Sequence, residues 1–360
     1  MSKPLVELND IKIMKLFVFP GNIEEDILSI GAQQLPYMRT SFFSNIVKES
    51  EQMILDLIGC QEGRVIPLTS SGTGAMDAVV TNYVSTKKKA LVIAGGSFGY
   101  RWEALCKYYN IDHYTHSVEF GKDIDYSKLE EDIKREGVDV LLCQQHETSS
   151  GQLFNISLIG AICKANGVSL VVDAISSFLS EPLNMNDMGV DICLTSSQKG
   201  LNILPGIALI ILSKNLEAHK FSNKSYYFDF QENLKNLTRG QTPYSPATSI
   251  FLQLHERLVR LTKAGLNATL DNVNRKALYF RGLCNKYGWK RPVDTPANCI
   301  TGFFVNNNGD ILFEELMSRG FCIMPGGTPN YFRVSHLGVQ TEEDLTNLAK
   351  QIHEIETLNR

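Results

Sequence analysis

The chain has 360 residues, of which 43% are hydrophobic and 21% are charged, and this predicts a soluble protein with a large core and a smaller second domain. Its net charge is -4 and its longest basic run is Lys87–Lys89, so we expect no nucleic-acid partner. No segment approaches the roughly 20 apolar residues of a membrane span, and the start, MSKPLVELNDIK, lacks the apolar centre of a signal peptide. We therefore expect a cytoplasmic protein without a membrane partner.

From residue 64 onward, short apolar runs alternate with amphipathic segments. The runs that we expect to be strands are 90–95, 139–145, 169–174, 191–197 and 206–213, and a helix is expected at 157–167. Near-continuous Val, Ile and Leu runs separated by helices predict an α/β fold in which a mostly parallel sheet is covered by helices. Ligands of such sheets bind at the carboxyl ends of the strands.

After residue 247 the pattern changes to two amphipathic helices, short strands and a charged terminal helix. This change predicts a smaller α+β domain at the C-terminus. We therefore expect an N-terminal segment, 1–25, that contributes to the active site and the small domain, a large domain, 26–247, and a small domain, 248–360.

The eight cysteines occur singly, with no Cys-x-x-Cys pair, and several lie in apolar strand or helix patterns. This predicts reduced core residues rather than disulfides. No His-Glu-x-x-His motif and no Cys/His cluster is present, so we expect no metal site. His146 and His336 are interpreted as packed or supporting groups.

Candidate binding residues follow the first strand region, in LTSSGTGAMDAVV. Ser70, Ser71, Gly72, Thr73 and Gly74 precede a helix with an apolar face. A glycine-rich turn that opens a helix offers free backbone N–H groups and the positive end of the helix dipole, which suits a phosphate. A plain helix cap explains the same residues equally well.

Two further segments place polar or aromatic groups after strands. Glycines flank Phe98 after the run 90–95, which predicts a ring held on a tight loop where it can stack on a heteroaromatic ring; plain packing is the alternative. In HETSSGQLFNI, Glu147, Thr148 and Ser149 follow the next run, and a hydroxyl there can bond a ring oxygen, a simple turn being the alternative.

Asp173 ends the run SLVVD, and Lys199 follows the run DICLTSSQ. An acid and a desolvated amine at one sheet edge predict bound pyridoxal 5'-phosphate (PLP): the lysine forms the Schiff base and the aspartate keeps the pyridine nitrogen protonated. The alternatives are a helix N-cap for Asp173 and a surface position for Lys199. Arg333, in NYFRVSHLG, can clamp a substrate carboxylate or form an interdomain salt bridge.

Together these motifs resemble aminotransferase class V, a group of fold-type I PLP enzymes, in particular the 2-aminoethylphosphonate–pyruvate and alanine–glyoxylate (serine–pyruvate) aminotransferases. The resemblance runs through nearly the whole chain, in FPGN, SSGTGAMDAV, GGSFGYRW, HETSSGQLFNI, VVDAISS, SSQKGL, QTPYSPA and FRVSHLG. It implies a fold-type I PLP-dependent transferase.

Carried over by position, the resemblance implies a set of cofactor-binding residues: Ser71, Gly72, Thr73, Gly74, Ala75, Phe98, Thr148, Asp173, Ile175, Gln198, Lys199 and Thr242. Thr73, Gly74, the Ala75 amide and Gln198 then bind the phosphate, and Phe98 stacks on the ring. Thr148 contacts the ring oxygen and Ile175 packs beneath the ring. Lys199 and Asp173 are the catalytic pair, and Thr242 reaches the phosphate of a partner subunit, which implies a homodimer with shared sites.

On the substrate side the resemblance assigns Arg333 to the substrate carboxylate, with Gly21 and Asn22 lining the pocket. The chain departs from the family here. Phe19–Asn22 replaces a Thr-Pro-Gly-Pro-like run, and LPYMRTSFF lacks the usual histidine and acidic residue. Arg39 or Arg101 can supply a second positive charge for a phosphonate or dicarboxylate, although each also suits the surface.

The expected function is therefore a transaminase that moves an amino group from a small amine or amino acid, with 2-aminoethylphosphonate as the named donor, to pyruvate. An alanine–glyoxylate or serine–pyruvate enzyme is the nearest alternative. A PLP lyase or a desulfurase, with Cys322 as its only small-domain cysteine candidate, is another, and a non-catalytic binding protein on the same fold is the third.

Overall fold

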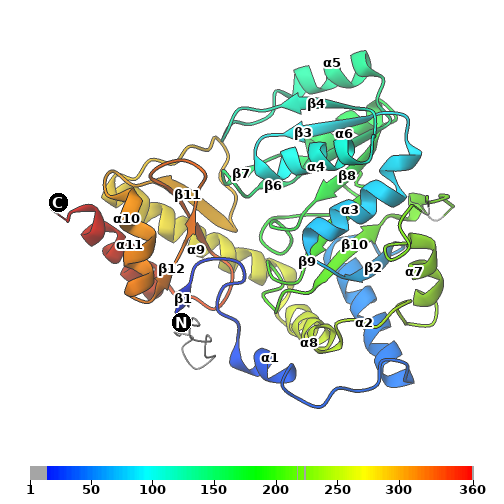
Figure 1. Cartoon of the computed structure of the whole chain (residues 1–360), viewed down its shortest axis with the longest axis horizontal. Coiled ribbons are helices and arrows are strands. Elements are labelled where there is room, and N and C mark those ends of the chain that lie inside the picture. The colour runs from blue at the N-terminus through cyan, green and yellow to red at the C-terminus, as the bar shows by residue number, and fades with distance from the viewer. Residues whose placement is uncertain (1–13, 217, 223, 359–360) are drawn as a thin grey trace, which may run out of the picture.

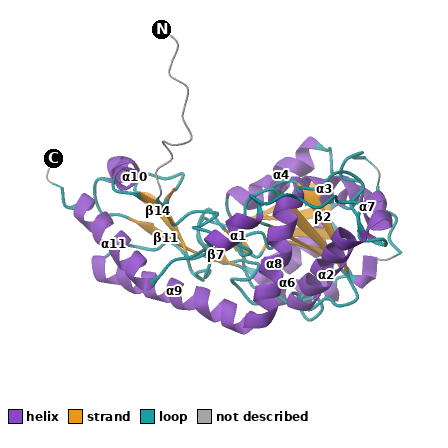
Figure 2. Ribbon diagram, turned by 90° about the horizontal axis from the view of Figure 1, so that it is seen from below, coloured by secondary structure: helices purple, strands orange, loops and turns teal. Residues whose placement is uncertain are grey.

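The computed structural model describes residues 14–216, 218–222 and 224–358. They form a large lobe and a smaller one (Figure 1). Seen from below, the long helix α9 (Leu266–Tyr287) runs from the small lobe to the large one (Figure 2).

A seven-stranded sheet forms the centre of the large lobe. Its strands are β2 (Arg64–Thr69), β3 (Ala90–Ala94), β4 (His113–Ser117), β5 (Val140–Gln144), β8 (Ser169–Asp173), β9 (Ile192–Ser196) and β10 (Ile207–Leu212). The strand order is β2-β10-β9-β8-β5-β3-β4. β10 is antiparallel to both of its neighbours, β2 and β9, and all the other pairs are parallel. The prediction of a mostly parallel sheet is confirmed, and every expected run contains its observed strand.

Helices cover this sheet, as the apolar character of its strands requires. They are α1 (Glu25–Ile30), α2 (Ser41–Leu57), α3 (Gly72–Asn82), α4 (Ser97–Tyr108), α5 (Tyr126–Glu136), α6 (Ile156–Ala165), α7 (Phe230–Leu237) and α8 (Thr248–Ala264), with short 3-10 turns at Val84–Thr86 and Lys214–Leu216. Several begin at side-chain caps: the Asp125 carboxylate accepts from Lys128 N, and Asn155 Oδ1 accepts from Leu158 N. Such caps satisfy amides that have no partner inside the helix.

The small lobe is built around a three-stranded antiparallel sheet in the order β11-β14-β13. Its elements are β11 (Ile300–Phe304), α10 (Gly309–Ser318), β12 (Phe321–Cys322), β13 (Met324–Pro325), β14 (Tyr331–Ser335) and α11 (Glu342–Glu356). β12 pairs in parallel with β1 (Lys15–Leu16), so the N-terminal segment joins the small lobe. A hairpin of β6 (His146–Glu147) and β7 (Gln152–Leu153) follows β5.

The hydrophobic core changes within α9, not at residue 248. Phe251, Leu258 and other apolar side chains of α8 pack in the large-lobe core, whereas Phe280 and Cys284 of α9 pack in the small-lobe core. The expected boundary after residue 247 therefore lies before a helix whose side chains pack with the large lobe. Residues 1–13 of the expected N-terminal segment lie outside the described residues.

All eight cysteines are free, as predicted from their spacing; seven are buried and Cys322 is partly exposed. Cys322 lies in β12 rather than on a long loop, so the feature that a desulfurase cysteine needs is not present at this position. Within the described ranges, no helix has both the length and the apolar character required to cross a membrane.

Candidate active site

The predicted cofactor residues meet at the carboxyl edge of the large sheet. The turn before α3 follows β2, Phe98 follows β3, Asp173 ends β8 and Lys199 follows β9. The charges of Asp173, Arg333 and Arg101 all act on the pKa of Lys199. Residues far apart in the sequence therefore lie close enough to Lys199 for their charges to act on its amine.

Lys199 is the most unusual group in this space. It is only 9% exposed, and burial lowers the pKa of its amine to about 8, against the opposing effect of Asp173. Its Nζ has no hydrogen-bond partner among the described residues and lies 4.0 Å from the centre of the Phe19 ring and 5.6 Å from that of Phe98. A larger share of neutral amine than in an ordinary lysine makes this side chain a nucleophile near neutral pH.

Asp173 is 5% exposed, and its Oδ1 accepts a hydrogen bond of 2.8 Å from Ile175 N. Burial raises the pKa of its carboxyl to about 6, while the Ile175 amide and the charge of Lys199 act in the opposite direction. The residues after Asp173 form turns, so it caps no helix. Its second oxygen has no partner in the described part of the chain and is free to accept from a protonated ring nitrogen.

The N-terminus of α3 offers the predicted anion site. Ser71 caps the helix, because its Oγ accepts from Gly74 N at 3.4 Å, while the Gly72 and Thr73 amides donate to no described group. A Cβ added at Gly72 would lie 2.5 Å from Ile175 Cδ1. A side chain at position 72 would therefore displace the end of the Ile175 side chain, where this helix end packs against the Asp173–Ile175 turn.

Phe98 lies in the first turn of α4, which corrects the expectation of a loop. The Glu147 carboxylate holds this helix end: it accepts from Phe98 N at 3.4 Å and from Gly99 N at 3.1 Å. The Arg101 guanidinium lies 4.7 Å from the centre of the Phe98 ring and donates to Thr73 Oγ1 at 2.9 Å. Phe98 is thus fixed by its backbone and by a cation that also reaches the α3 helix end.

Glu147 therefore positions the start of α4, a role that the sequence did not reveal, because it showed Glu147 only as one of several polar residues after a strand. Its carboxylate also accepts from Ser149 N, Ser149 Oγ and Gln144 Nε2. A carboxylate at a helix N-terminus interacts favourably with the helix dipole. The motif HET marks a polar turn in the sequence. The amides that Glu147 caps lie 49 and 48 positions earlier in the chain, so the sequence does not link the two.

Thr148 is the start of a buried polar chain. Its Oγ1 donates to Ser176 Oγ at 2.8 Å, and Ser176 Oγ lies 2.8 Å from His146 Nδ1. The same nitrogen lies 3.0 Å from Cys299 Sγ. Neither Ser176 nor Cys299 was singled out in the sequence, because nothing local marks them as neighbours of Thr148.

On the substrate side, Arg333 reaches from β14 to the large lobe. Its Nη1 donates to Thr148 O at 3.0 Å and its Nη2 donates to Pro325 O at 2.8 Å. It pairs with no described carboxylate, so the interdomain salt bridge is not seen in this part of the chain. Its Nε is buried without a partner within the described residues, and burial lowers the pKa of its guanidinium.

The N-terminal segment reaches the site through Phe19 rather than through Asn22. Asn22 Oδ1 accepts from Leu16 N at 2.8 Å and its Nδ2 donates to Met14 O at 3.0 Å, so both polar atoms hold the segment itself. A side chain at Gly21 would collide with the carbonyl oxygen of Leu337. Substrate contacts of Gly21 and Asn22 stay predictions.

Gln198 and Thr242 also stay predictions as phosphate-binding residues. Gln198 Oε1 is buried and has no partner among the described residues. Thr242 Oγ1 donates to Tyr244 O at 2.7 Å, and the Thr242 carbonyl accepts from Arg39 Nη1 at 2.6 Å. Arg39 bonds the carbonyls of Thr242 and Pro243, whereas Arg101 lies beside Phe98 and Thr73. Arg101 is therefore the better-placed candidate for a second substrate cation.

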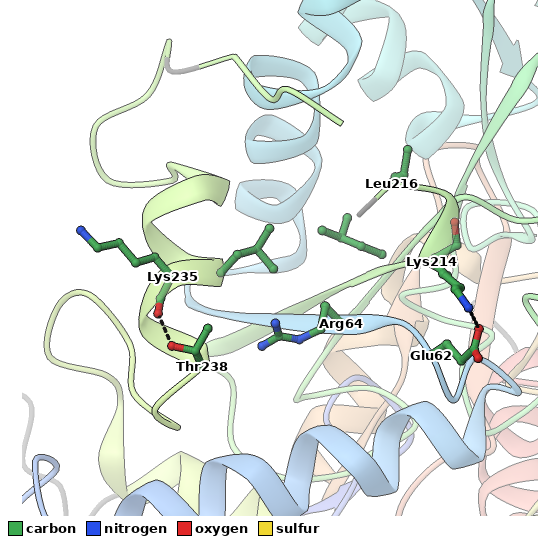
Figure 3. Close-up of a pocket in the computed structure, with 9 residues that line it drawn as sticks. Glu62, Arg64, Lys214, Leu216, Lys235 and Thr238 are labelled. Carbon is green, nitrogen blue, oxygen red and sulfur yellow. Dashed lines mark hydrogen bonds and ion pairs between the residues drawn. The ribbon is translucent and has the colours of Figure 1, made fainter. Parts of the chain in front are cut away.

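A separate cavity of about 320 Å³ lies at the opposite edge of the sheet, where β2 begins and β10 ends. In Figure 3, Lys235 and Thr238 lie on one side of it, Glu62 and Lys214 on the other, and Arg64 between them. None of the predicted site residues lines it. It is therefore distinct from the candidate active site.

The residues at the carboxyl edge match the parts of PLP. Free amides at the start of α3 suit its phosphate, the unpartnered oxygen of Asp173 suits its ring nitrogen, and the unpaired amine of Lys199 suits its aldehyde. Each of these groups is left without a protein partner within the described residues, so each is free to bond the matching part of the cofactor.

Comparison with known proteins supports this match. The family model for aminotransferase class V matches residues 36–229. A 42 kDa subunit of a soluble hydrogenase from Anabaena cylindrica is 28% identical over 352 residues, 93% of this chain and 91% of the relative. A serine–glyoxylate aminotransferase from Hyphomicrobium methylovorum is 28% identical over 344 residues, 90% of this chain and 84% of the relative.

Two further similarities bear on the predictions. A 2-aminoethylphosphonate–pyruvate transaminase from Lysinibacillus sphaericus is 24% identical over 326 residues, 86% of this chain and 88% of the relative. The solved structure of an alanine–glyoxylate aminotransferase from Nostoc sp. superposes with a TM-score of 0.91, covers 98% of this chain and 97% of its own, and is 19% identical, so it supports the fold alone. The chain belongs to the class-V aminotransferase family and is a PLP-dependent aminotransferase.

Proposed function

We propose that this aminotransferase moves an amino group from 2-aminoethylphosphonate, or from another small primary amine or amino acid, to pyruvate. The observation that carries the proposal is the buried amine of Lys199, whose pKa burial lowers to about 8 and on which the charges of Asp173 and Arg333 also act. An amine, a carboxylate that keeps the cofactor ring protonated and a carboxylate-binding cation are the three groups that this reaction needs.

When bound, PLP supplies an electron sink, because its protonated ring accepts the electron pair that the donor carbon releases. Lys199 Nζ binds the cofactor and, once released, holds and moves the proton of the donor carbon. The Asp173 carboxylate holds a proton on the ring nitrogen. The α3 amides bind the phosphate, and the Phe98 ring packs on the cofactor plane.

Arg333 is proposed to bind the carboxylate of the oxo acid. A guanidinium has five N–H donors, and two described bonds to carbonyl oxygens leave Nε and other N–H groups available. Because Arg333 also bonds the Thr148 carbonyl, it ties substrate binding to the position of Thr148. A charged pair of this kind forms strong, directional hydrogen bonds.

Two classes of amino donor fit this site: a phosphonate-bearing amine, and an amino acid such as serine or alanine. A phosphonate needs a further cation, and Arg101, beside Phe98 and Thr73, is the described candidate. Serine or alanine with glyoxylate needs only Arg333, and the serine–glyoxylate relative, at 28% identity, supports that alternative as well as the phosphonate relative does at 24%.

A donor screen with the PLP-loaded enzyme tests the proposal. Each donor, 2-aminoethylphosphonate, serine or alanine, is added without acceptor while the absorption of the bound cofactor is recorded. A transaminase changes the spectrum once and releases one equivalent of carbonyl product, whereas a lyase turns over continuously. Reaction with serine or alanine but not with the phosphonate would reject the named donor and leave the aminotransferase standing.

Arg101→Gln sharpens this test. If Arg101 binds a phosphonate, the substitution raises KM for 2-aminoethylphosphonate about tenfold or more and leaves KM for serine or alanine nearly unchanged. Arg101→Lys keeps the charge and should recover part of the loss. Equal effects on all donors would instead assign Arg101 to holding Phe98 and Thr73.

We also propose a homodimer in which Thr242 contributes to the partner's cofactor site, on the basis of the QTPYSPA resemblance. Mixing two inactive variants, Lys199→Ala and Thr242→Ala, tests it after light scattering has established the mass. In a shared site, one mixed dimer combines an intact Lys199 with an intact partner Thr242, so activity rises above that of either variant. No gain on mixing, with each variant impaired alone and subunit exchange verified, contradicts the sharing.

A further inference from the structure

His146 is buried beside the site and was expected to be a packed or supporting group. It is 2% exposed, and its Nδ1 lies 2.8 Å from Ser176 Oγ and 3.0 Å from Cys299 Sγ. Its Nε2 is buried and has no partner among the described residues. All of its hydrogen bonding therefore passes through one ring nitrogen.

The imidazole is neutral at working pH. Burial lowers the pKa of His146 well below its usual value, and the positive charges of Lys199, Arg333 and Arg281 lower it further. Cys299 faces the same nitrogen and stays a thiol, because burial raises the pKa of Cys299. A neutral imidazole has one donor and one acceptor nitrogen, so the neighbours of Nδ1 decide the tautomer.

The hydrogen-bond directions follow from Thr148. Thr148 Oγ1 donates to Ser176 Oγ at 2.8 Å, so the Ser176 proton is free to be donated onward. His146 Nδ1 is the nearer acceptor, at 2.8 Å, whereas the His146 carbonyl oxygen is 3.4 Å away. A chain of hydrogen bonds from Thr148 through Ser176 to Nδ1 uses the shorter of these two contacts, and it requires the ring proton to lie on Nε2.

We propose that His146 is a positioning residue for the cofactor: by accepting the end of the Thr148–Ser176 chain at Nδ1, it turns the Thr148 proton away from the cofactor ring oxygen. This inference rests on the proposed placement of the ring oxygen beside Thr148. With its proton committed to Ser176, Thr148 presents oxygen lone pairs to that space. Lone pairs disfavour an ionised ring oxygen, so the chain keeps this oxygen protonated to a higher pH.

Two substitutions interrupt the hydrogen bonds from Thr148 through Ser176 to His146 at different points. His146→Phe fills the buried volume without an acceptor, and Ser176→Ala removes the link while His146 remains. In Ser176→Ala the Thr148 proton becomes free to bond the ring oxygen, whereas in His146→Phe the Ser176 hydroxyl keeps only the longer contact to the carbonyl of residue 146 and holds Thr148 less firmly. The pH midpoint of the absorption change of bound PLP should therefore fall by about half to one unit in Ser176→Ala and by less in His146→Phe, and the double variant should match Ser176→Ala.

A conservative pair tests which nitrogen acts. The amide of Asn reaches the position of Nδ1, whereas that of Gln reaches the position of Nε2. Because only Nδ1 has partners, His146→Asn should keep the wild-type midpoint and His146→Gln should resemble His146→Phe. A merely structural role would rank the variants by their stability instead.

Two controls distinguish an effect of the Thr148–Ser176–His146 hydrogen bonds from a general effect of replacing buried groups. His336 is also fully buried, and its Nε2 bonds Thr301 Oγ1 at 2.8 Å in the small lobe, so His336→Phe should lower stability without moving the midpoint. Cys299→Ala removes the other neighbour of Nδ1 and should also leave the midpoint in place. A shift in Cys299→Ala that equals the shift in Ser176→Ala would assign the effect to the thiol and overturn the proposal.

PLP affinity gives a second readout, measured by titration of the apoprotein. The His146→Phe and Ser176→Ala variants should bind PLP with a dissociation constant changed by about two- to tenfold, the size of one hydrogen bond. Wild-type midpoint and affinity in both variants would overturn the inference. Failure of the wild-type chain to bind PLP at all would instead overturn the cofactor placement on which the inference rests.

Discussion

The cofactor side and the substrate side of the site differ in what their polar atoms do. On the cofactor side, Lys199 Nζ, one oxygen of Asp173 and the first amides of α3 have no partner among the described residues. On the substrate side, Arg333 and Asn22 bond backbone atoms of the chain itself. The polar atoms named at the sheet edge are thus unpaired, whereas those on the substrate side are mostly bonded, with Arg333 Nε as the unpaired exception within the described residues.

Unpaired polar groups at the sheet edge can gain hydrogen bonds from a ligand without giving any up. Binding of PLP there is therefore expected to stabilise the folded chain. Groups already bonded to carbonyl oxygens must share those bonds with a substrate. We expect substitutions on the cofactor side to have the larger effects on chemistry.

The largest effect is expected at Lys199. Lys199→Ala should lower kcat by about 10³-fold or more, because it removes the nucleophile and the group that moves the proton. Turnover with the best donor measures it. Lys276→Met is the matched control: Lys276 is also buried and burial also lowers its pKa to about 8, but its Nζ bonds Gly338 O. If both variants lost equal activity, the comparison between the two sides would fail.

Asp173→Ala is expected to follow, with kcat lowered by about 10²- to 10³-fold while PLP still binds. The reason is that the ring loses the carboxylate that keeps its nitrogen protonated. Absorption of bound PLP and single-turnover kinetics with the donor measure binding and chemistry separately. Turnover at the wild-type rate would contradict the assigned role.

A smaller effect is expected from Arg333→Lys, which keeps the charge but loses the pair of N–H groups that can bond both oxygens of a carboxylate. KM for the oxo acid should rise about 10- to 100-fold, the range for a hydrogen bond to a charged group, with a smaller change in kcat. Steady-state kinetics with varied acceptor measures both. Arg281→Lys is the control, because Arg281 is a buried arginine that donates to the Ala297 carbonyl; a matching rise in KM there would show that the effect is general.

The smallest effect concerns the stability of the apoprotein. The folded-state pKa of Asp173 is raised from 3.8 to about 6, so its contribution to stability is present below the unfolded pKa and is lost as pH rises through about 6. Asn cannot ionise and keeps an acceptor for Ile175 N. Asp173→Asn should therefore be more stable than the wild type at pH 7.5 by roughly 1–2 kcal/mol, a difference that fades toward pH 5.

Urea unfolding of the apoproteins at the two pH values measures this prediction. A variant that is less stable at pH 7.5 would mean that the attraction between Asp173 and Lys199 outweighs the cost of burial. That outcome would erase the proposed contrast, because the cofactor side would then be satisfied without its ligand.

The strand runs and the residues that end them could be predicted from local sequence. Continuous apolar runs mark buried parallel strands, so the positions of Asp173 and Lys199 after such runs were predictable, while a helix cap and a surface position remained alternatives for their roles. The glycine-rich turn before α3 was predictable for a similar local reason, because the residues that start the helix are adjacent in the sequence.

Contacts between segments that are distant in sequence could be seen only in the folded structure. Glu147 caps the helix that carries Phe98, His146 meets Cys299 across 153 positions, and α8 packs with the large lobe although the pattern changes before it. Each depends on which elements lie side by side, and periodicity describes a helix or strand face without naming its partner. Side-chain packing between elements selects that partner, and it therefore placed the groups around Thr148 that the sequence left unassigned.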